Sequence, residues 1–229
     1  MTELITRRFA SRSTLESALE ERLAAAIGAP GVPAPALMLS GGTTPLPAYR
    51  ALSLRPALAR NETLRILFSD DRYVPGDSPA SNYHQARPLL DALSLPPAAV
   101  LRVRTELPLE QAARDYESQL EALLESGAGI GLGLLGLGAD GHTASLFGAA
   151  DLERARGRLA IAVRRPDGMS AVSVTPDLLG HVAEPVFVVA GGTKHDALTA
   201  LEKQDPQLIA WRAVAECSAV ELWVCADAP

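Results

Sequence analysis

Four short apolar segments of this sequence share one pattern: each ends in Gly, Ser or Asp and is followed by residues with helical periodicity. The segments are 36–39, 64–68, 130–137 and 186–190. Runs without polar side chains are typical of strands buried on both faces of a parallel sheet. Strands that alternate with helices predict βαβ units with right-handed crossovers. We therefore expect an α/β fold: a three-layer, Rossmann-like open sheet, mostly parallel, with helices on both faces.

Other segments complete this prediction. Further strands are expected at 99–104, 159–164, 171–174 and 220–225, and helices at 13–27 and 109–124. The first helix has Ser13 as its expected cap, with Glu16 three residues on. Hydrophobic residues make up 48% of the chain, and its proline-rich pieces resemble turns more than linkers, so one domain spanning residues 1–229 is the simpler interpretation.

Composition excludes several classes of function. The net charge is −6 and no basic stripe is present, which argues against nucleic-acid binding. No apolar run approaches the roughly 18 residues that a spanning helix needs, and charges interrupt the N-terminal segment, so we expect a cytoplasmic protein. Cys217 and Cys225 are the only cysteines and have no metal-ligand spacing, so we expect buried, reduced thiols and no metal site.

The segment 136–145 (GLGADGHTAS) puts a carboxylate and an imidazole on a glycine-rich turn directly after a buried strand. Its glycines allow positive φ angles and close approach to a ligand. We expect Thr143 to cap a helix, with His142 near the helix N-terminus at the carboxyl edge of the sheet. An imidazole with a pKa near ~6.5 is a suitable general base, and Asp140 could orient it. The alternative is a histidine without chemistry that only caps the helix.

A second strand-to-helix junction has the features of a phosphate cradle: free backbone N–H groups, a helix N-terminus and hydroxyl groups. Its residues are Ser40, Gly41, Gly42, Thr43 and Thr44, followed by Pro45. The alternative is an ordinary turn that is rich in small residues.

Two further junctions contribute charged side chains. Arg72 could bind a phosphate or carboxylate through two hydrogen bonds, while Asp70 could act as a base or orient one. Lys194 follows another strand and could reach a bound phosphate. The alternatives are a surface ion pair for Asp70 and Arg72 and a solvated side chain for Lys194. Because loops at the carboxyl ends of parallel strands converge, all of these residues are expected to meet in one crevice.

Taken together, these motifs resemble the 6-phosphogluconolactonase family, which is grouped with glucosamine-6-phosphate isomerase/deaminase. The resemblance covers nearly the whole chain in order: SGGTTP at 40–45, DDRYVP at 70–75, SN at 81–82, GLGADGHTASLF at 136–147 and GTK at 192–194. Two features favour the lactonase: Arg72 stands where deaminases tend to have tyrosine, and TASLF follows His142.

The resemblance implies hydrolysis of 6-phospho-D-glucono-1,5-lactone to 6-phospho-D-gluconate, the second step of the oxidative pentose phosphate pathway, without metal or cofactor. It implies that His142 activates water and that the 40–44 loop, Arg72 and Lys194 hold the phosphate. Two departures stand out. Asp71 replaces the usual glutamate, and the arginine that the family often has at 169–171 is missing, so Arg164 or Arg165 could substitute for it.

Two other functions stay open at this point. An isomerase/deaminase would use Asp70 as a carbon base and His142 to open the sugar ring. A catalytically inactive sensor would bind sugar phosphates without turnover. In each case we expect a small-molecule partner and a monomer or weak homo-oligomer, with no membrane partner.

Overall fold

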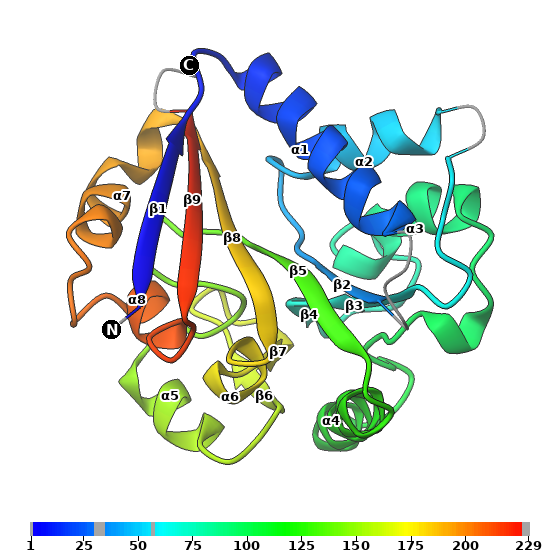
Figure 1. The fold of residues 1–229 in the computed structure, drawn as a ribbon. Coiled ribbons are helices and arrows are strands. Elements are labelled where there is room, and N and C mark those ends of the chain that lie inside the picture. The colour runs from blue at the N-terminus through cyan, green and yellow to red at the C-terminus, as the bar shows by residue number, and fades with distance from the viewer. Residues whose placement is uncertain (1, 30–34, 56–57, 226–229) are drawn as a thin grey trace.

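The computed structural model describes residues 2–29, 35–55 and 58–225 and shows the predicted α/β architecture (Figure 1). Its central sheet has six parallel strands in the order β1-β9-β8-β5-β2-β3. Their bounds are β1 (Glu3–Arg8), β2 (Pro35–Leu39), β3 (Arg65–Phe68), β5 (Gly129–Leu135), β8 (Val182–Ala190) and β9 (Ala219–Cys225). The four apolar runs that predict the sheet supply β2, β3, β5 and β8.

A smaller antiparallel sheet lies beside the central one, in the order β4-β7-β6. Its strands are β4 (Asp70–Arg72), β6 (Ala160–Arg164) and β7 (Ser170–Val174). Ser69 joins the two sheets, because its N–H donates to the Leu39 carbonyl at 2.8 Å and its carbonyl accepts from the Val174 N–H at 2.9 Å. The acidic pair that follows β3 therefore lies on β4, an edge strand of the smaller sheet, and not in a simple strand-to-helix loop.

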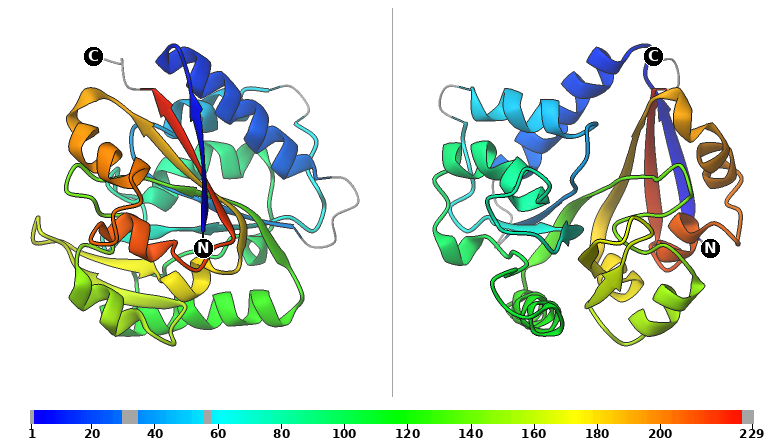
Figure 2. Two further views of the ribbon diagram at one scale, coloured as in Figure 1. Left: turned by 60° about the vertical axis from the view of Figure 1, so that its left-hand side comes forward. Right: turned by 180° about the vertical axis from the view of Figure 1, so that it is seen from behind.

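Helices cover both faces of the central sheet, as predicted (Figure 2). Leu37 and Leu39 of β2 pack with α1, α2 and α3 on one face, whereas the alternate residues Ala36 and Met38 face the cluster that includes α4, α5, α7 and α8. The helices are α1 (Arg12–Gly28), α2 (Leu46–Ser53), α3 (Asn82–Ala92), α4 (Leu109–Glu125), α5 (Ala149–Ala155), α6 (Pro176–Leu179), α7 (His195–Glu202) and α8 (Ile209–Ala213), with 3-10 segments η1 (Pro97–Ala99) and η2 (Gly192–Lys194).

Two predicted helix starts are wrong. The N-cap of α1 is Ser11 and not Ser13: the Ser11 hydroxyl accepts from the Thr14 N–H, and the Thr14 hydroxyl accepts from the Ser11 N–H. No helix begins at Thr143, because its hydroxyl donates to the Gly136 carbonyl at 2.8 Å and residues 143–146 close a tight turn. The next helix, α5, starts six residues later.

The strand predictions have two errors of a different kind. Segment 99–104 forms a single bridge from Val100 to Ile66 and then no ladder, because the Gln119 side chain pairs with both the N–H and the carbonyl of Arg102. The edge strand β1 is absent from the prediction. It is largely exposed and mixes polar with apolar residues, so it lacks the apolar run by which the other parallel strands are identified.

Cys217 and Cys225 are buried free thiols, as predicted. Within the described part of the chain, no helix combines the length and apolar character needed to cross a membrane.

A buried carboxylate ties α4 to the smaller sheet. Glu117 accepts hydrogen bonds from the Arg158 guanidinium, with Nε 2.8 Å from Oε1, and from the Leu159 N–H at 3.0 Å. Burial alone would raise the pKa of Glu117, but these hydrogen bonds outweigh it and lower the pKa below its usual range. The ionised side chain therefore stabilises the folded state.

Replacing Glu117 with alanine is expected to lower the free energy of unfolding by about 2 to 3 kcal/mol at pH 7, because it leaves the Leu159 N–H and Arg158 without their acceptor. The pKa of Glu117 is lower in the folded state than in the unfolded state. The loss of unfolding free energy in the variant should therefore be largest at neutral pH and should shrink as pH falls below about 4.5. Urea unfolding at several pH values measures the free energy of unfolding of the variant and of the wild type. Glu121→Ala, at an exposed position of the same helix, is the control; equal losses in both variants would contradict the account.

Candidate active site

The predicted site residues meet in a cleft of about 230 Å³ at the carboxyl ends of β2, β3 and β5. The cleft is lined by Ser40, Gly41, Gly42, Asp70, Arg72, Asn82, Gly136, Leu137, Gly138, His142, Ala144, Arg165 and Lys194. A smaller hollow of about 50 Å³ adjoins it, and Thr43 and Thr44 line this hollow together with Lys194. A groove of about 550 Å³ beside α4 is larger but contains none of the predicted site residues.

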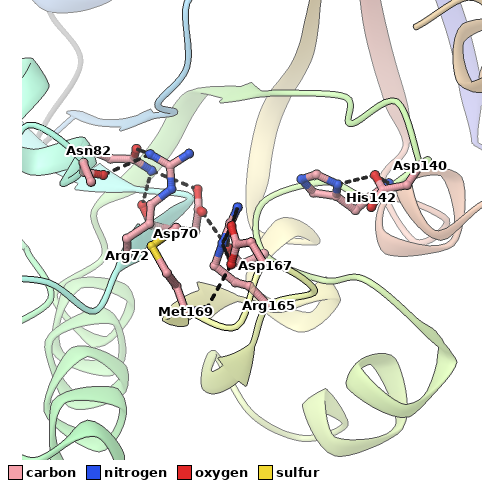
Figure 3. Close-up of polar contacts among 10 residues, drawn as sticks. Asp70, Arg72, Asn82, Asp140, His142, Arg165, Asp167 and Met169 are labelled. Atoms are coloured by element: carbon pink, nitrogen blue, oxygen red, sulfur yellow. Dashed lines mark hydrogen bonds and ion pairs between the residues drawn. The ribbon is translucent and has the colours of Figure 1, made fainter.

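The imidazole of His142 is held on one side by Asp140. Oδ1 of Asp140 forms a hydrogen bond with Nδ1 of His142 and also accepts from the His142 N–H at 3.3 Å. Burial opposes ionisation of Asp140, but the contact with His142 outweighs it and lowers the pKa of the carboxyl. Because Nδ1 faces a carboxylate, the neutral ring carries its proton there, and Nε2 is the unprotonated nitrogen. Figure 3 shows Asp140 on the side of the ring away from Arg165 and Arg72.

Glycines give this pair the space it occupies. A Cβ on Gly138 would lie 2.1 Å from Nδ1 of His142 and 2.4 Å from Oδ1 of Asp140. Gly141 has a φ of +82°, and a Cβ there would lie 2.5 Å from Leu208. The turn closes through hydrogen bonds from the Gly138 N–H to the His142 carbonyl at 2.9 Å and from the Gly141 N–H to the Gly138 carbonyl at 3.0 Å. The glycines of the sequence motif thus shape the site of the Asp140–His142 contact.

Asp70 is buried, and donors surround its carboxylate. Oδ2 accepts from the Ser145 hydroxyl at 2.7 Å, while Oδ1 accepts from the Ser69 hydroxyl at 3.1 Å and from Nδ2 of Asn82 at 3.2 Å. Arg165 also donates to the Ser145 hydroxyl, with Nη1 3.3 Å from Oγ.

The structure brings Asp70 into the cleft but does not bring it into contact with His142, whose carboxylate partner is Asp140.

Asn82 links Asp70 to Arg72 (Figure 3). Its Nδ2 donates to the Asp70 carbonyl at 2.8 Å, and its Oδ1 accepts from Nη1 of Arg72 at 2.8 Å. A Cβ on Gly41 would lie 1.9 Å from this Oδ1, so the 40–42 loop approaches Asn82 because Gly41 has no side chain. Nε of Arg72 is buried and has no hydrogen-bond partner among the described residues. Asn82 therefore fixes Nη1 of Arg72, a residue that lines the cleft.

The other residue of the acidic pair, Asp71, has a structural place. Its carboxylate accepts from the N–H groups of Asn82 and Tyr83 and from the Ser81 hydroxyl, at the start of α3. Burial raises the pKa of Asp71 to about 6, although these hydrogen bonds lower it in part. Asp71 therefore fixes the segment that carries Asn82 and does not line the cleft.

Two further cations line the cleft. Lys194 has no ion-pair or hydrogen-bond partner within residues 2–29, 35–55 and 58–225, and burial lowers the pKa of its ammonium. Of the two arginines expected as substitutes at the end of β6, Arg165 lines the cleft and Arg164 is exposed outside it. Arg165 is held by Asp167, with Nη2 3.0 Å from Oδ2. The lining of the cleft thus contains three cationic side chains and one carboxylate, that of Asp70, whose oxygens already accept hydrogen bonds. This excess of positive charge suits the cleft to an anion.

Sequence reasoning missed part of this arrangement. The hydrogen bonds from Ser145 to Asp70 and from Arg165 to Ser145 depend on the pairing of β4 with β7, and no local motif encodes that pairing. One signal was available: Ser145 belongs to the same motif as His142, and a serine in such a motif is a candidate partner for a neighbouring carboxylate.

Comparisons with known proteins agree with the resemblance. A family model described as glucosamine-6-phosphate isomerases/6-phosphogluconolactonase matches residues 9–223. A 6-phosphogluconolactonase of Synechocystis sp. is 39% identical over 179 residues, covering 75% of this chain and 73% of the relative. A 6-phosphogluconolactonase of Treponema pallidum is 37% identical over 172 residues, covering 72% and 71%. The crystal structure of 6-phosphogluconolactonase from Thermotoga maritima superposes with a TM-score of 0.77 at 26% identity, covering 98% of this chain and 99% of that one.

Proposed function

The chain belongs to the glucosamine-6-phosphate isomerase/6-phosphogluconolactonase family, and from this premise we propose that its cleft hydrolyses 6-phospho-D-glucono-1,5-lactone to 6-phospho-D-gluconate. This reaction is the second step of the oxidative pentose phosphate pathway. One observation carries the proposal: an imidazole oriented by a carboxylate lies in a cleft with three cations. The matched relatives named as lactonases support the same reaction.

His142 is the general base in this proposal. Nε2 takes a proton from a water molecule while the water oxygen attacks the lactone carbonyl carbon. The negative charge then on the carbonyl oxygen is stabilised by backbone N–H groups of the glycine loops at 41–42 and 136–137, since the Gly138 N–H already donates to the His142 carbonyl. When the intermediate collapses, the bond from the carbonyl carbon to the ring oxygen breaks, and His142 returns its proton to that oxygen. Asp140 stabilises the imidazolium between these two transfers.

The cations hold the phosphate at the far end of the sugar. Lys194, Arg72 and Arg165 supply charge-assisted donors, and the 40–44 loop supplies backbone N–H groups and hydroxyls. Asp70 orients Ser145 and Asn82, and through Asn82 it positions Arg72. Positioning and one general base are sufficient for a strained ester, because such an ester is already reactive and a base contributes about 10²- to 10⁴-fold. The proposed steps use neither a metal ion nor an organic cofactor.

The proposal extends to the cellular location and the oligomeric state of the enzyme. We expect it to act in the cytoplasm on a small-molecule lactone, as a monomer or weak homo-oligomer. The acidic net charge argues against a nucleic-acid partner.

Parallel assays with two substrates test the function. Freshly generated 6-phospho-D-glucono-1,5-lactone is followed against its spontaneous hydrolysis, and glucosamine 6-phosphate is followed by ammonia release. We expect turnover of the lactone and none of the amino sugar, because both oxygens of the Asp70 carboxylate are occupied by donors and are poorly placed to take a proton from carbon. Ammonia release would favour the deaminase instead, and binding of both compounds without turnover would favour a sensor.

Replacing Lys194 with alanine is expected to raise KM for the phosphorylated lactone about 10- to 100-fold with little change in kcat. The reason is that the ammonium would bind the phosphate and not the reacting carbonyl; a hydrogen bond to a charged group contributes about 1.5 to 3 kcal/mol. Steady-state kinetics measure the effect. Lys203→Ala is the matched control, because Lys203 is exposed at the end of α7 and outside the cleft. A KM that is unchanged in Lys194→Ala would remove this residue from the phosphate site.

A further inference from the structure

Phe147 contacts two groups with separate tasks in the proposed reaction. Its ring centroid lies 4.4 Å from that of the His142 imidazole, with an interplanar angle of 39°, and 5.2 Å from the guanidinium carbon of Arg165. We propose that Phe147 is a positioning residue that fixes the general base and the phosphate-binding Arg165 relative to one another. This inference rests on the proposed function, and it assigns a role to a residue outside the lining of the cleft.

Phe147 is anchored independently of both partners. Its N–H donates to Oδ2 of Asp151 in α5 at 2.9 Å, and its partly buried side chain packs against the hydrophobic core. The preceding turn is fixed by the Leu146 N–H, which donates to the Thr143 carbonyl at 2.9 Å, and by the Ser145 N–H, which donates to the Ser173 hydroxyl at 3.0 Å. The ring therefore belongs to the rigid part of the molecule and can restrict groups that lie against it.

His142 needs such a restriction. Its hydrogen bond to Asp140 fixes Nδ1, but the Asp140 side chain is 54% exposed and stands on a glycine-rich turn. A contact at one ring atom to an exposed carboxylate leaves the direction of Nε2 poorly defined. The Phe147 ring limits rotation of the imidazole, so Nε2 keeps one direction into the cleft.

Arg165 gains from the same ring. Nε and Nη2 contact Asp167, which is exposed at the tip of the β6–β7 hairpin, and Nη1 contacts Ser145. The aromatic face attracts the guanidinium, a contact of about 0.5 to 1 kcal/mol at exposed sites, and sets its plane. A hairpin residue is thereby held at a fixed position relative to His142, which lies 23 residues earlier in a different loop. In the proposed reaction, the position of Arg165 relative to His142 sets the distance between the bound phosphate and the attacked carbonyl carbon.

Phe147→Leu tests the inference, because leucine keeps apolar bulk and removes the aromatic face. With the phosphorylated lactone we expect kcat to fall about 10-fold, because the base is less well oriented, and KM to rise about 5-fold, because Arg165 loses the aromatic contact. With unphosphorylated D-glucono-1,5-lactone we expect the same fall in kcat and no change in KM, since Arg165 has no phosphate to bind. Phe147→Tyr keeps the aromatic ring, so its kcat and KM should both lie within about twofold of the wild-type values. A structural role alone would not produce this division between substrates.

Double-mutant cycles separate positioning from general damage. In a His142→Ala background, Phe147→Leu should lower kcat no further, because it acts through the imidazole. Phe9→Leu is the matched control: it removes the contact of Phe9 with Trp223, whose ring centroid is 5.3 Å away and outside the cleft, and should change neither kcat nor KM. An equal fall in the His142→Ala background, or wild-type kinetics in Phe147→Leu, would overturn the inference. Absence of lactone turnover by the wild type would instead overturn the proposed function.

Discussion

Replacing His142 with alanine is expected to lower kcat for hydrolysis of 6-phospho-D-glucono-1,5-lactone by about 10²- to 10⁴-fold, the range that one general base contributes. KM should change little, because the proposed phosphate ligands stay in place. The fold should be unaffected, since Asp140, the hydrogen-bond partner of the imidazole, is itself largely exposed. The melting temperature of the variant should therefore stay close to that of the wild type.

Two further measurements make this result specific to the base. Added imidazole should restore part of the lost kcat in His142→Ala, because a free base can enter the space that the side chain leaves. His181→Ala, which changes an exposed histidine outside the cleft, should keep wild-type kinetics. Full activity of His142→Ala would show that another group activates the water and would direct attention to Asp70.

Replacing Gly138 with alanine is expected to lower kcat by about 100-fold although it changes no polar group. The new methyl group would lie 2.1 Å from Nδ1 of His142 and 2.4 Å from Oδ1 of Asp140, so the pair must separate or turn away. A misplaced catalytic group costs about this factor. Stability should change little, because the displaced atoms are the ends of side chains that can move toward solvent.

Gly131→Ala is the matched control for this prediction. It makes the same substitution in β5, where a Cβ would meet nothing within 4 Å. We expect its kcat to equal that of the wild type. Equal kcat values for Gly138→Ala and the wild type would mean that the Asp140–His142 contact is dispensable for turnover.

The central sheet was predictable because its strands are buried on both faces. Segments such as 36–39 and 186–190 contain no polar side chain, and short runs of this kind between helical segments are typical of the inner strands of a parallel sheet. The smaller sheet was harder to predict as a whole. Its strand β4 (Asp70–Arg72) has three polar residues and becomes a strand only because β7 lies beside it. Tertiary pairing overrides local propensity there.

Side-chain hydrogen bonds account for two of the wrong predictions. Thr143 has the chemistry of a helix cap, but its hydroxyl donates to the Gly136 carbonyl and helps to close a turn. Segment 99–104 has the apolar content of a strand, but Gln119 of α4 pairs with its backbone at Arg102. Gly136 lies in the same motif as Thr143 and Gln119 lies in a later helix, but helical or strand periodicity specifies neither partner, so it predicts the wrong element.

The candidate site was largely predictable for a topological reason. Residues after the carboxyl ends of neighbouring parallel strands converge, so Ser40, Asp70 and His142 line one cleft although they are far apart in sequence. The contacts within the cleft were not predictable to the same extent. Whether Asp70 or Asp140 would contact His142, and whether Arg164 or Arg165 would enter the cleft, depends on the path of two turns.

The disappearance of freshly generated 6-phospho-D-glucono-1,5-lactone at increasing protein concentrations tests the central claim most directly. We expect a rate that exceeds spontaneous hydrolysis, rises in proportion to protein concentration and saturates with substrate. A rate equal to spontaneous hydrolysis at every protein concentration would contradict lactone hydrolysis in this cleft.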